Sequence, residues 1–164
     1  MADPKPPKPA NARGAARLAA VQALYQMDVG GVSREHVVGE FEEWRLGNEL
    51  DGIQYRDADP AFFRELVGGV VDNQRELDPK IHIALVAGWP LARLDVTLRA
   101  ILRAATWELT SFRDVPGRVA ISEYVDVAKA FFEGEESRMV NGVLDTLARQ
   151  LRPSEFDDRP QAGA

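Results

Sequence analysis

The sequence has no cysteine, only two histidines and no hydrophobic run long enough to cross a bilayer. The absence of cysteine excludes disulfide bonds, thiolate metal sites and a cysteine nucleophile. His36 and His82 stand far apart in the sequence, without metal-ligand spacing to a second residue, so no metal site is expected. The N-terminus has no apolar stretch of the signal-peptide kind. We therefore expect a cytoplasmic protein without a cofactor, a metal or a membrane partner.

Residue patterns typical of enzymes are also scarce. No glycine-rich loop follows a predicted strand, and the strand–serine–helix elbow of hydrolases is missing. Adjacent acidic residues such as Glu42 and Glu43 would point about 100° apart on a helix, so they do not form a carboxylate pair. The pair Gly68-Gly69 is better explained by close helix packing. We expect no catalytic residues and no enzymatic activity.

Charge is distributed unevenly along the chain. The net charge of −6 by itself disfavours a nucleic-acid partner, because lysine and arginine supply most of the affinity for phosphate. However, residues 28–76 hold twelve acidic and five basic residues, whereas residues 1–27 hold four basic residues and one acidic residue. Two interpretations stay open: solvated acidic surfaces with a solubilising basic tail, or one basic locus that confines nucleic acid to a single site.

Apolar residues follow helical spacing almost throughout, so we expect an all-α fold with about seven helices. Helices are expected to begin near residues 11, 33, 59, 78, 91 and 122, and the last one ends before Pro153. Asp59-Pro60 and Asp78-Pro79 each combine an N-cap residue with proline at the first helical position, which predicts two separate helix starts. Residues 47–58 are expected to form a polar loop. Leu102 and Leu144 are expected in the core.

The same pattern predicts the domain organisation. Residues 1–10 are expected to form a disordered, basic and proline-rich arm, because they cannot bury enough apolar surface to offset their ordering entropy. Residues 11–152 should form one helical domain, with an N-terminal lobe over about 11–77 and a C-terminal lobe over about 78–152. Residues 153–164 are expected to be a polar tail.

Arg13 and Arg17 stand four residues apart, so both should face the same side of the first helix. Lys5 and Lys8 precede them in the arm. Arginine binds phosphate through paired N–H groups and stacks on unpaired bases, and flexible basic arms fold on RNA. The alternative is that the two arginines merely solubilise the helix. In either case we expect both side chains to be exposed.

Several segments, in order along the chain, resemble the NusB family. They are Arg17–Asp28, Leu98–Leu109, Asp114–Pro116 with Val119–Glu123, Val127–Ala130, and Val140–Asp145. The last is the most specific, because Asn-Gly is an unfavourable choice inside a helix. The resemblance covers roughly residues 11–152.

This resemblance implies two three-helix bundles packed together in a NusB-like fold. It also implies a transcription antitermination factor that needs no cofactor. Such a factor binds the boxA element of nascent ribosomal-RNA transcripts together with NusE, a protein of the small ribosomal subunit. The complex then helps RNA polymerase to pass terminators.

The resemblance also implies site residues. The expected RNA-binding positions are Lys5, Lys8, Arg13, Gly14 and Arg17. Gly14 and Ala15 stand where many members of the family have arginine, so the basic motif is depleted. The expected partner-binding positions are Gln22, Tyr25 and Leu98, the last at a position that is acidic in some relatives.

Two other functions are weighed against this one. The depleted arginine motif would suit a helical adaptor that binds protein only. A less favoured alternative is the RNA-recognition partner of a ribosomal-RNA methyltransferase, because the N-terminal domain of one cytosine methyltransferase family has the same fold. Such an enzyme would need its cofactor-binding domain on another chain.

Overall fold

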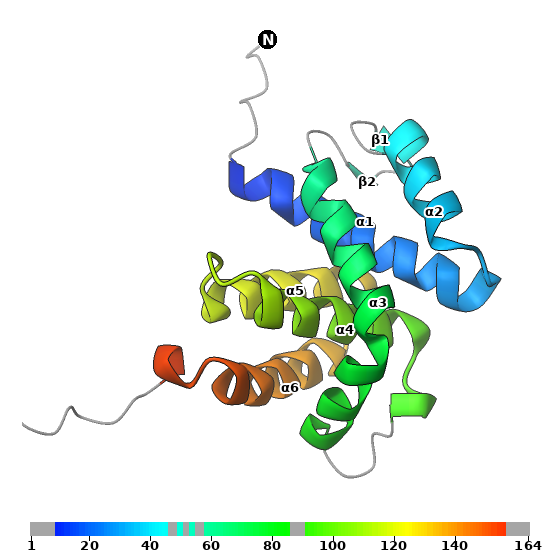
Figure 1. The fold of residues 1–164 in the computed structure, drawn as a ribbon. Coiled ribbons are helices and arrows are strands. Elements are labelled where there is room, and N and C mark those ends of the chain that lie inside the picture. Colours follow the sequence, from blue (N-terminus) through cyan, green and yellow to red (C-terminus); the bar gives the residue numbers. More distant parts are fainter. Residues whose placement is uncertain (1–8, 46–48, 51–52, 55–57, 86–90, 157–164) are drawn as a thin grey trace, which may run out of the picture.

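The structure is a computed structural model that describes residues 9–45, 49–50, 53–54, 58–85 and 91–156 (Figure 1). Within these ranges six α-helices carry the fold, and shorter helical turns cover Phe41–Arg45, Leu91–Arg93 and Pro153–Phe156. The α-helices are α1 (Pro9–Gly30), α2 (Arg34–Glu40), α3 (Pro60–Ala84), α4 (Val96–Ser111), α5 (Gly117–Phe131) and α6 (Glu136–Leu151). The expected all-α fold is confirmed, with six helices in place of about seven.

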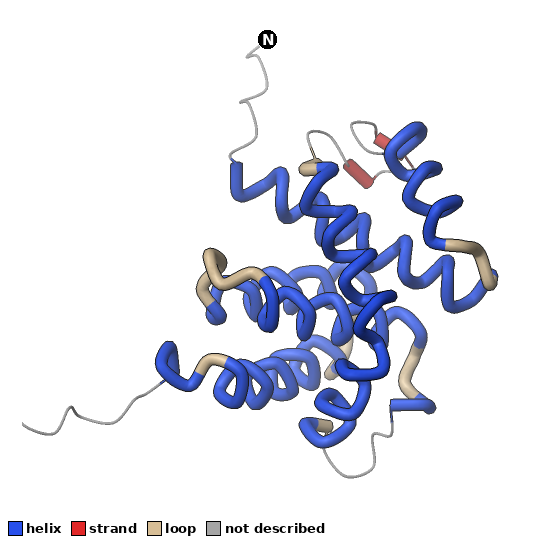
Figure 2. Tube along the Cα trace, viewed as in Figure 1, coloured by secondary structure: helices blue, strands red, loops and turns tan. Residues whose placement is uncertain are grey.

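A minor exception lies in the segment that was expected to be a polar loop. β1 (Glu49–Leu50) and β2 (Ile53–Gln54) pair antiparallel, with Glu49 opposite Gln54 and Leu50 opposite Ile53. They are the only strands in the described ranges and are drawn in red in Figure 2. Two residues per strand contribute little to the fold, whose core is helical.

The second helix start predicted at Asp78-Pro79 is wrong. Asp59 caps α3 as expected, since its Oδ1 accepts a hydrogen bond from the Phe62 N–H at 3.0 Å. Pro79, however, lies inside α3, which runs on to Ala84. The Pro79 ring is exposed, and the buried residues Leu77 and Ile81 keep one face of the helix in the core on both sides of it. The free energy gained by burial of that face offsets the cost of the one hydrogen bond that proline cannot donate. The expected lobe boundary at residues 77–78 therefore falls inside a helix.

The helices form two groups, α1–α3 and α4–α6, around one continuous core (Figure 1). The central helix α4 packs against α1 and α3 on one side and against α5 and α6 on the other. Leu102 and Leu144 are fully buried, as expected. Close packing explains Gly69, because a Cβ there would lie 1.9 Å from the Trp107 Nε1 atom of α4.

Two expected helix boundaries are wrong. α1 begins at Pro9, inside the segment expected to be an arm, and α5 begins at Gly117 instead of Ser122. The start of α5 depends on residues beyond α6. A Cβ at Gly117 would lie 2.8 Å from the Phe156 ring, and the Gly117 N–H donates to Glu155 Oε1 at 2.8 Å. Because Phe156 is buried, the expected polar tail does not begin at residue 153.

The turn between α4 and α5 is held by a buried arginine, Arg152. Its guanidinium donates to the carbonyl oxygens of Leu109 at 2.9 Å and Phe112 at 2.8 Å, and also to that of Val115. The Leu109 carbonyl lies in the last turn of α4, where carbonyl groups lack partners within the helix, and those of Phe112 and Val115 belong to the turn that follows. The turn from residue 112 to residue 116 is thereby fixed against α6.

No helix in the described part of the chain is both long and apolar enough to span a bilayer. Among the same residues, histidine and carboxylate side chains form no group of three that could hold a metal ion.

Candidate nucleic-acid interface

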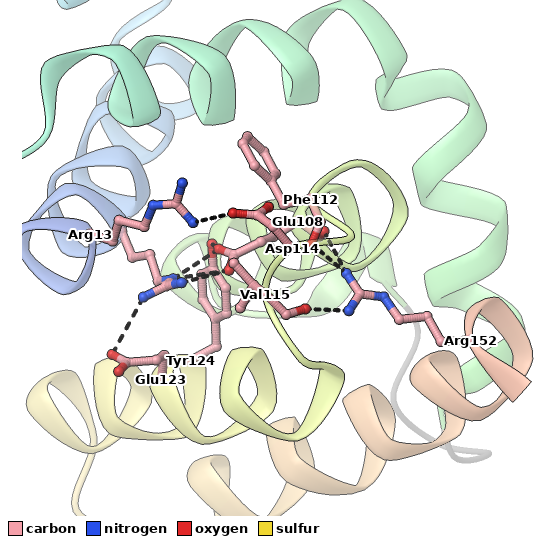
Figure 3. A network of polar contacts seen from close by, with 9 residues as sticks. Arg13, Glu108, Phe112, Asp114, Val115, Glu123, Tyr124 and Arg152 are labelled. Carbon is pink, nitrogen blue, oxygen red and sulfur yellow. Dashed lines mark hydrogen bonds and ion pairs between the residues drawn. The ribbon is translucent and has the colours of Figure 1, made fainter. Parts of the chain in front are cut away.

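Arg17 is buried, so the expectation that its side chain is exposed is wrong. Its Nε donates to Glu108 Oε1 at 2.9 Å and its Nη2 to Glu108 Oε2 at 2.7 Å. The side chains of Arg17 and Glu108 are 3% and 0% exposed. The Tyr124 hydroxyl completes the cluster, since it donates to Glu108 Oε1 at 2.8 Å (Figure 3). Arg17 therefore ties α1 to α4 and α5.

The electrostatics of this cluster follow from burial and from Glu108. Burial alone would lower the pKa of the Arg17 guanidinium, but the hydrogen bonds and negative charge of Glu108 outweigh it, and the pKa is raised. Burial is also the main cause that raises the pKa of the Tyr124 hydroxyl well above its ordinary value, and the Glu108 carboxylate adds to it. The cluster therefore holds a charged arginine and a protonated tyrosine across the neutral pH range.

Arg13 stays at the surface, one turn before Arg17. Its Nη1 donates to Asp114 Oδ2 at 3.0 Å, and the two side chains are 36% and 63% exposed (Figure 3). The guanidinium carbon of Arg13 lies 4.8 Å from the centre of the Phe62 ring, and that of Arg17 lies 5.2 Å from it. The expectation that both arginines face one side of the helix is confirmed. Of the two, Arg13 is the one that solvent reaches.

Gly14, next to Arg13, faces a carboxylate. A Cβ at Gly14 would lie 3.5 Å from Glu123 Oε2, which is ordinary van der Waals contact. Glu123 Oε2 also lies 3.7 Å from Arg17 Nη1. Gly14 and Ala15 are half-buried and have no charged side chain, so these two positions offer no cation to RNA. Lys5 and Lys8, the other expected RNA-binding positions, lie outside the described residues.

Two of the three expected partner-binding residues meet at a groove. Gln22 and Tyr25 of α1 line a groove of about 390 Å³ together with Thr97 of α4 and Phe131 of α5. Tyr25 and Phe131 are exposed. The Oε1 atom of Gln22 is buried and accepts no hydrogen bond within the described part of the chain. The groove thus combines apolar surface with one unused acceptor.

Leu98, the third expected partner-binding residue, is buried in the core and is not available to a partner. The neighbouring Thr97 lines the groove in its place. Successive residues of a helix point about 100° apart, so a shift of one position separates the core-facing side from the groove.

Sequence reasoning missed the acidic residues that contact the arginines. These are Glu108 on α4, Asp114 in the following turn and Glu123 on α5. The sequence held one indication for Glu108, because it is the only acidic residue of α4 and adjoins the apolar residue Leu109. A lone acid in such a place requires a buried partner. Asp114 and Glu123 had no comparable signal.

The NusB family model matches residues 14–149 of this chain. A Rhodopseudomonas palustris (strain BisB18) protein named "Transcription antitermination protein NusB" is 61% identical over 153 residues, which are 93% of this chain and 90% of that protein. Among solved structures, T. maritima NusB superposes with a TM-score of 0.72 at 28% identity, covering 95% of this chain and 99% of its own. A chain of the "Crystal Structure of Antitermination Factors NusB and NusE in complex with dsRNA" gives a TM-score of 0.68 at 26% identity, covering 85% of this chain and 98% of its own.

Proposed function

This chain belongs to the NusB family, and we propose that it is a transcription antitermination factor that binds boxA-type RNA together with NusE. In this role it helps RNA polymerase, within an antitermination complex, to pass terminators on ribosomal-RNA operons. One observation carries the proposal: helix α1 bears a partly exposed arginine, Arg13, near its N-terminus and an exposed aromatic groove residue, Tyr25, further along. Twelve residues of helix correspond to about 18 Å, so RNA and a protein partner can bind side by side.

For RNA, we assign the phosphate contact to Arg13. Its guanidinium lies over the Phe62 ring and is reached by solvent, so N–H donors are available to a phosphate without a change in the fold. Arg17 is reassigned from a direct contact to a positioning residue, because its side chain is buried and its Nε and Nη2 donate to Glu108. Lys5 and Lys8 are proposed to add contacts from the segment that precedes α1.

For the protein partner, we assign the groove beside Tyr25. Exposed aromatic side chains are frequent anchors of protein interfaces. The unused acceptor of Gln22 favours a partner that supplies a hydrogen-bond donor at this point. One of the solved structures that this chain resembles is a complex of NusB and NusE with double-stranded RNA. NusE is therefore the proposed occupant of the groove.

The proposed role is regulatory and includes no catalytic step. The relatives matched over nearly their whole length are named antitermination proteins, which disfavours the alternative of a methyltransferase partner. A role on nascent transcripts implies a cytoplasmic location.

The experiment that tests this function is fluorescence anisotropy of a labelled single-stranded boxA-type RNA. The protein alone, NusE alone and an equimolar mixture are titrated at several salt concentrations, with an RNA of the same composition and scrambled sequence as the control. Because the net charge is −6, we expect weak binding by the protein alone and tighter, sequence-dependent binding by the mixture. A mixture that binds no better than NusE alone would contradict the proposal. If the two proteins still associated, the protein-only adaptor would be the better function.

A further inference from the structure

The arginines of α1 are outnumbered by the carboxylates that touch them. Arg13 contacts Asp114, and Arg17 contacts Glu108 and Glu123. Two positive charges thus face three negative ones, and the contact set carries a net charge of −1. A phosphate that approaches α1 meets a surface whose cations are already compensated within the protein.

Asp114 differs from the other two acids because it contacts Arg13, the arginine that solvent reaches. Glu108 is fully buried and Glu123 lies against the buried Arg17. Asp114 is itself exposed, and its only ion pair within the described residues is with Arg13, the proposed RNA contact. An RNA phosphate therefore competes with Asp114 for the same guanidinium.

The position of Asp114 is fixed by the fold. It lies in the turn that Arg152 holds through the carbonyl oxygens of Phe112 and Val115, one on each side of it (Figure 3). The hydrogen bond from Arg13 lowers the pKa of the Asp114 carboxyl group below its ordinary value. The carboxylate is thus charged at neutral pH and held where the RNA phosphate would bind.

We propose that Asp114 sets the RNA affinity of this protein, because its carboxylate binds Nη1 of the Arg13 guanidinium and competes with an RNA phosphate for that cation. This inference rests on the proposed function and adds to it a residue that opposes binding. Replacement of Asp114 by asparagine keeps the shape of the side chain and one oxygen acceptor but removes the charge. Because an exposed ion pair contributes little net free energy, we expect the gain in RNA affinity to be roughly two- to fivefold.

The test is a double-mutant cycle measured by RNA anisotropy in the presence of NusE. The four proteins are wild type, Asp114→Asn, Arg13→Ala and the double variant. Asp126→Asn is the matched control, because it also removes one negative charge from an exposed acidic residue. Asp126 lines a groove between α5 and α6, and within the described residues it forms no ion pair with Arg13 or Arg17. Circular dichroism and thermal melting check that each variant is folded.

We expect Asp114→Asn to tighten RNA binding in the wild-type background more than Asp126→Asn does, and to lose that advantage when Arg13 is alanine. If wild type binds RNA but the two asparagine variants behave alike, the inference about Asp114 is wrong while the proposed function stands. An advantage of Asp114→Asn that persists without Arg13 would also overturn it. If no variant binds RNA with NusE present, both the inference and the proposed function fail.

Discussion

The guanidinium of Arg17 donates two hydrogen bonds, of 2.9 and 2.7 Å, to the carboxylate of Glu108, and both side chains are buried. The two residues are 91 positions apart in the sequence and join α1 to α4. A residue that the sequence placed in an RNA-binding motif thus serves first as a connection between helices.

Removal of Arg17 alone should destabilise the protein strongly. Arg17→Met leaves the Glu108 charge buried without its cation, and loss of one partner of a buried pair costs about 3–5 kcal/mol. The double variant Arg17→Met with Glu108→Gln removes both charges and should lose less than the single variant. Chemical denaturation measures the free energy of unfolding of each. Equal stability of Arg17→Met and wild type would contradict this account of the pair.

Tyr124 should make stability depend on pH in the alkaline range. Its pKa is raised in the folded protein, so the unfolded chain loses the hydroxyl proton first, near the ordinary value of 10.0. The contribution is therefore complete below pH 10 and is lost as the pH rises above it. Denaturation at pH 8 to 11 should show a steeper loss for wild type than for Tyr124→Phe. Parallel curves would show that the hydroxyl group does not titrate differently in the two states.

Leu102→Ala and Leu144→Ala should each reduce the free energy of unfolding by about 2–5 kcal/mol, because both residues are fully buried around α4. Ile83→Ala is the matched control, since that side chain is 75% exposed. It should change stability by no more than about 0.5 kcal/mol. Melting temperatures that are equal in all three variants would mean that the helix faces are assigned wrongly.

Tyr25→Ala should weaken association with NusE about tenfold or more, because a large exposed anchor of the groove is lost. Val119→Ala, at a comparably exposed site on α5 outside the groove, should leave the affinity unchanged. Isothermal titration calorimetry with NusE measures both. If the two variants bind equally well, the groove is not the partner site. Leu98→Ala should instead lower stability, since Leu98 is buried.

The sequence predicted what local patterns determine. Asp59-Pro60 correctly marked the start of α3, because capping and proline geometry act within a few residues. The same signal failed at Asp78-Pro79, where burial of Leu77 and Ile81 against other helices kept α3 continuous. The predicted start of α5 was wrong for a related reason, since Gly117 lies against Phe156, a residue beyond α6.

The candidate site, too, has features that local patterns predicted and one that they did not. Four-residue spacing correctly placed Arg13 and Arg17 on one side of α1. The family resemblance pointed to Gln22 and Tyr25, and the structure has both of them in the lining of one groove. The burial of Arg17 was not predictable from helix α1, because it depends on Glu108 in a distant segment.

The central claim is that Arg13, and not Arg17, is the arginine of α1 that contacts RNA. The most direct test is the salt dependence of boxA-type RNA binding, in the presence of NusE, for wild type and Arg13→Ala. Each phosphate contact on a single strand contributes roughly 0.7 to the slope of log affinity against log salt concentration. We predict that Arg13→Ala weakens binding and flattens the slope by about that amount, with an unchanged melting temperature. An Arg13→Ala protein with the affinity and slope of wild type would contradict the account.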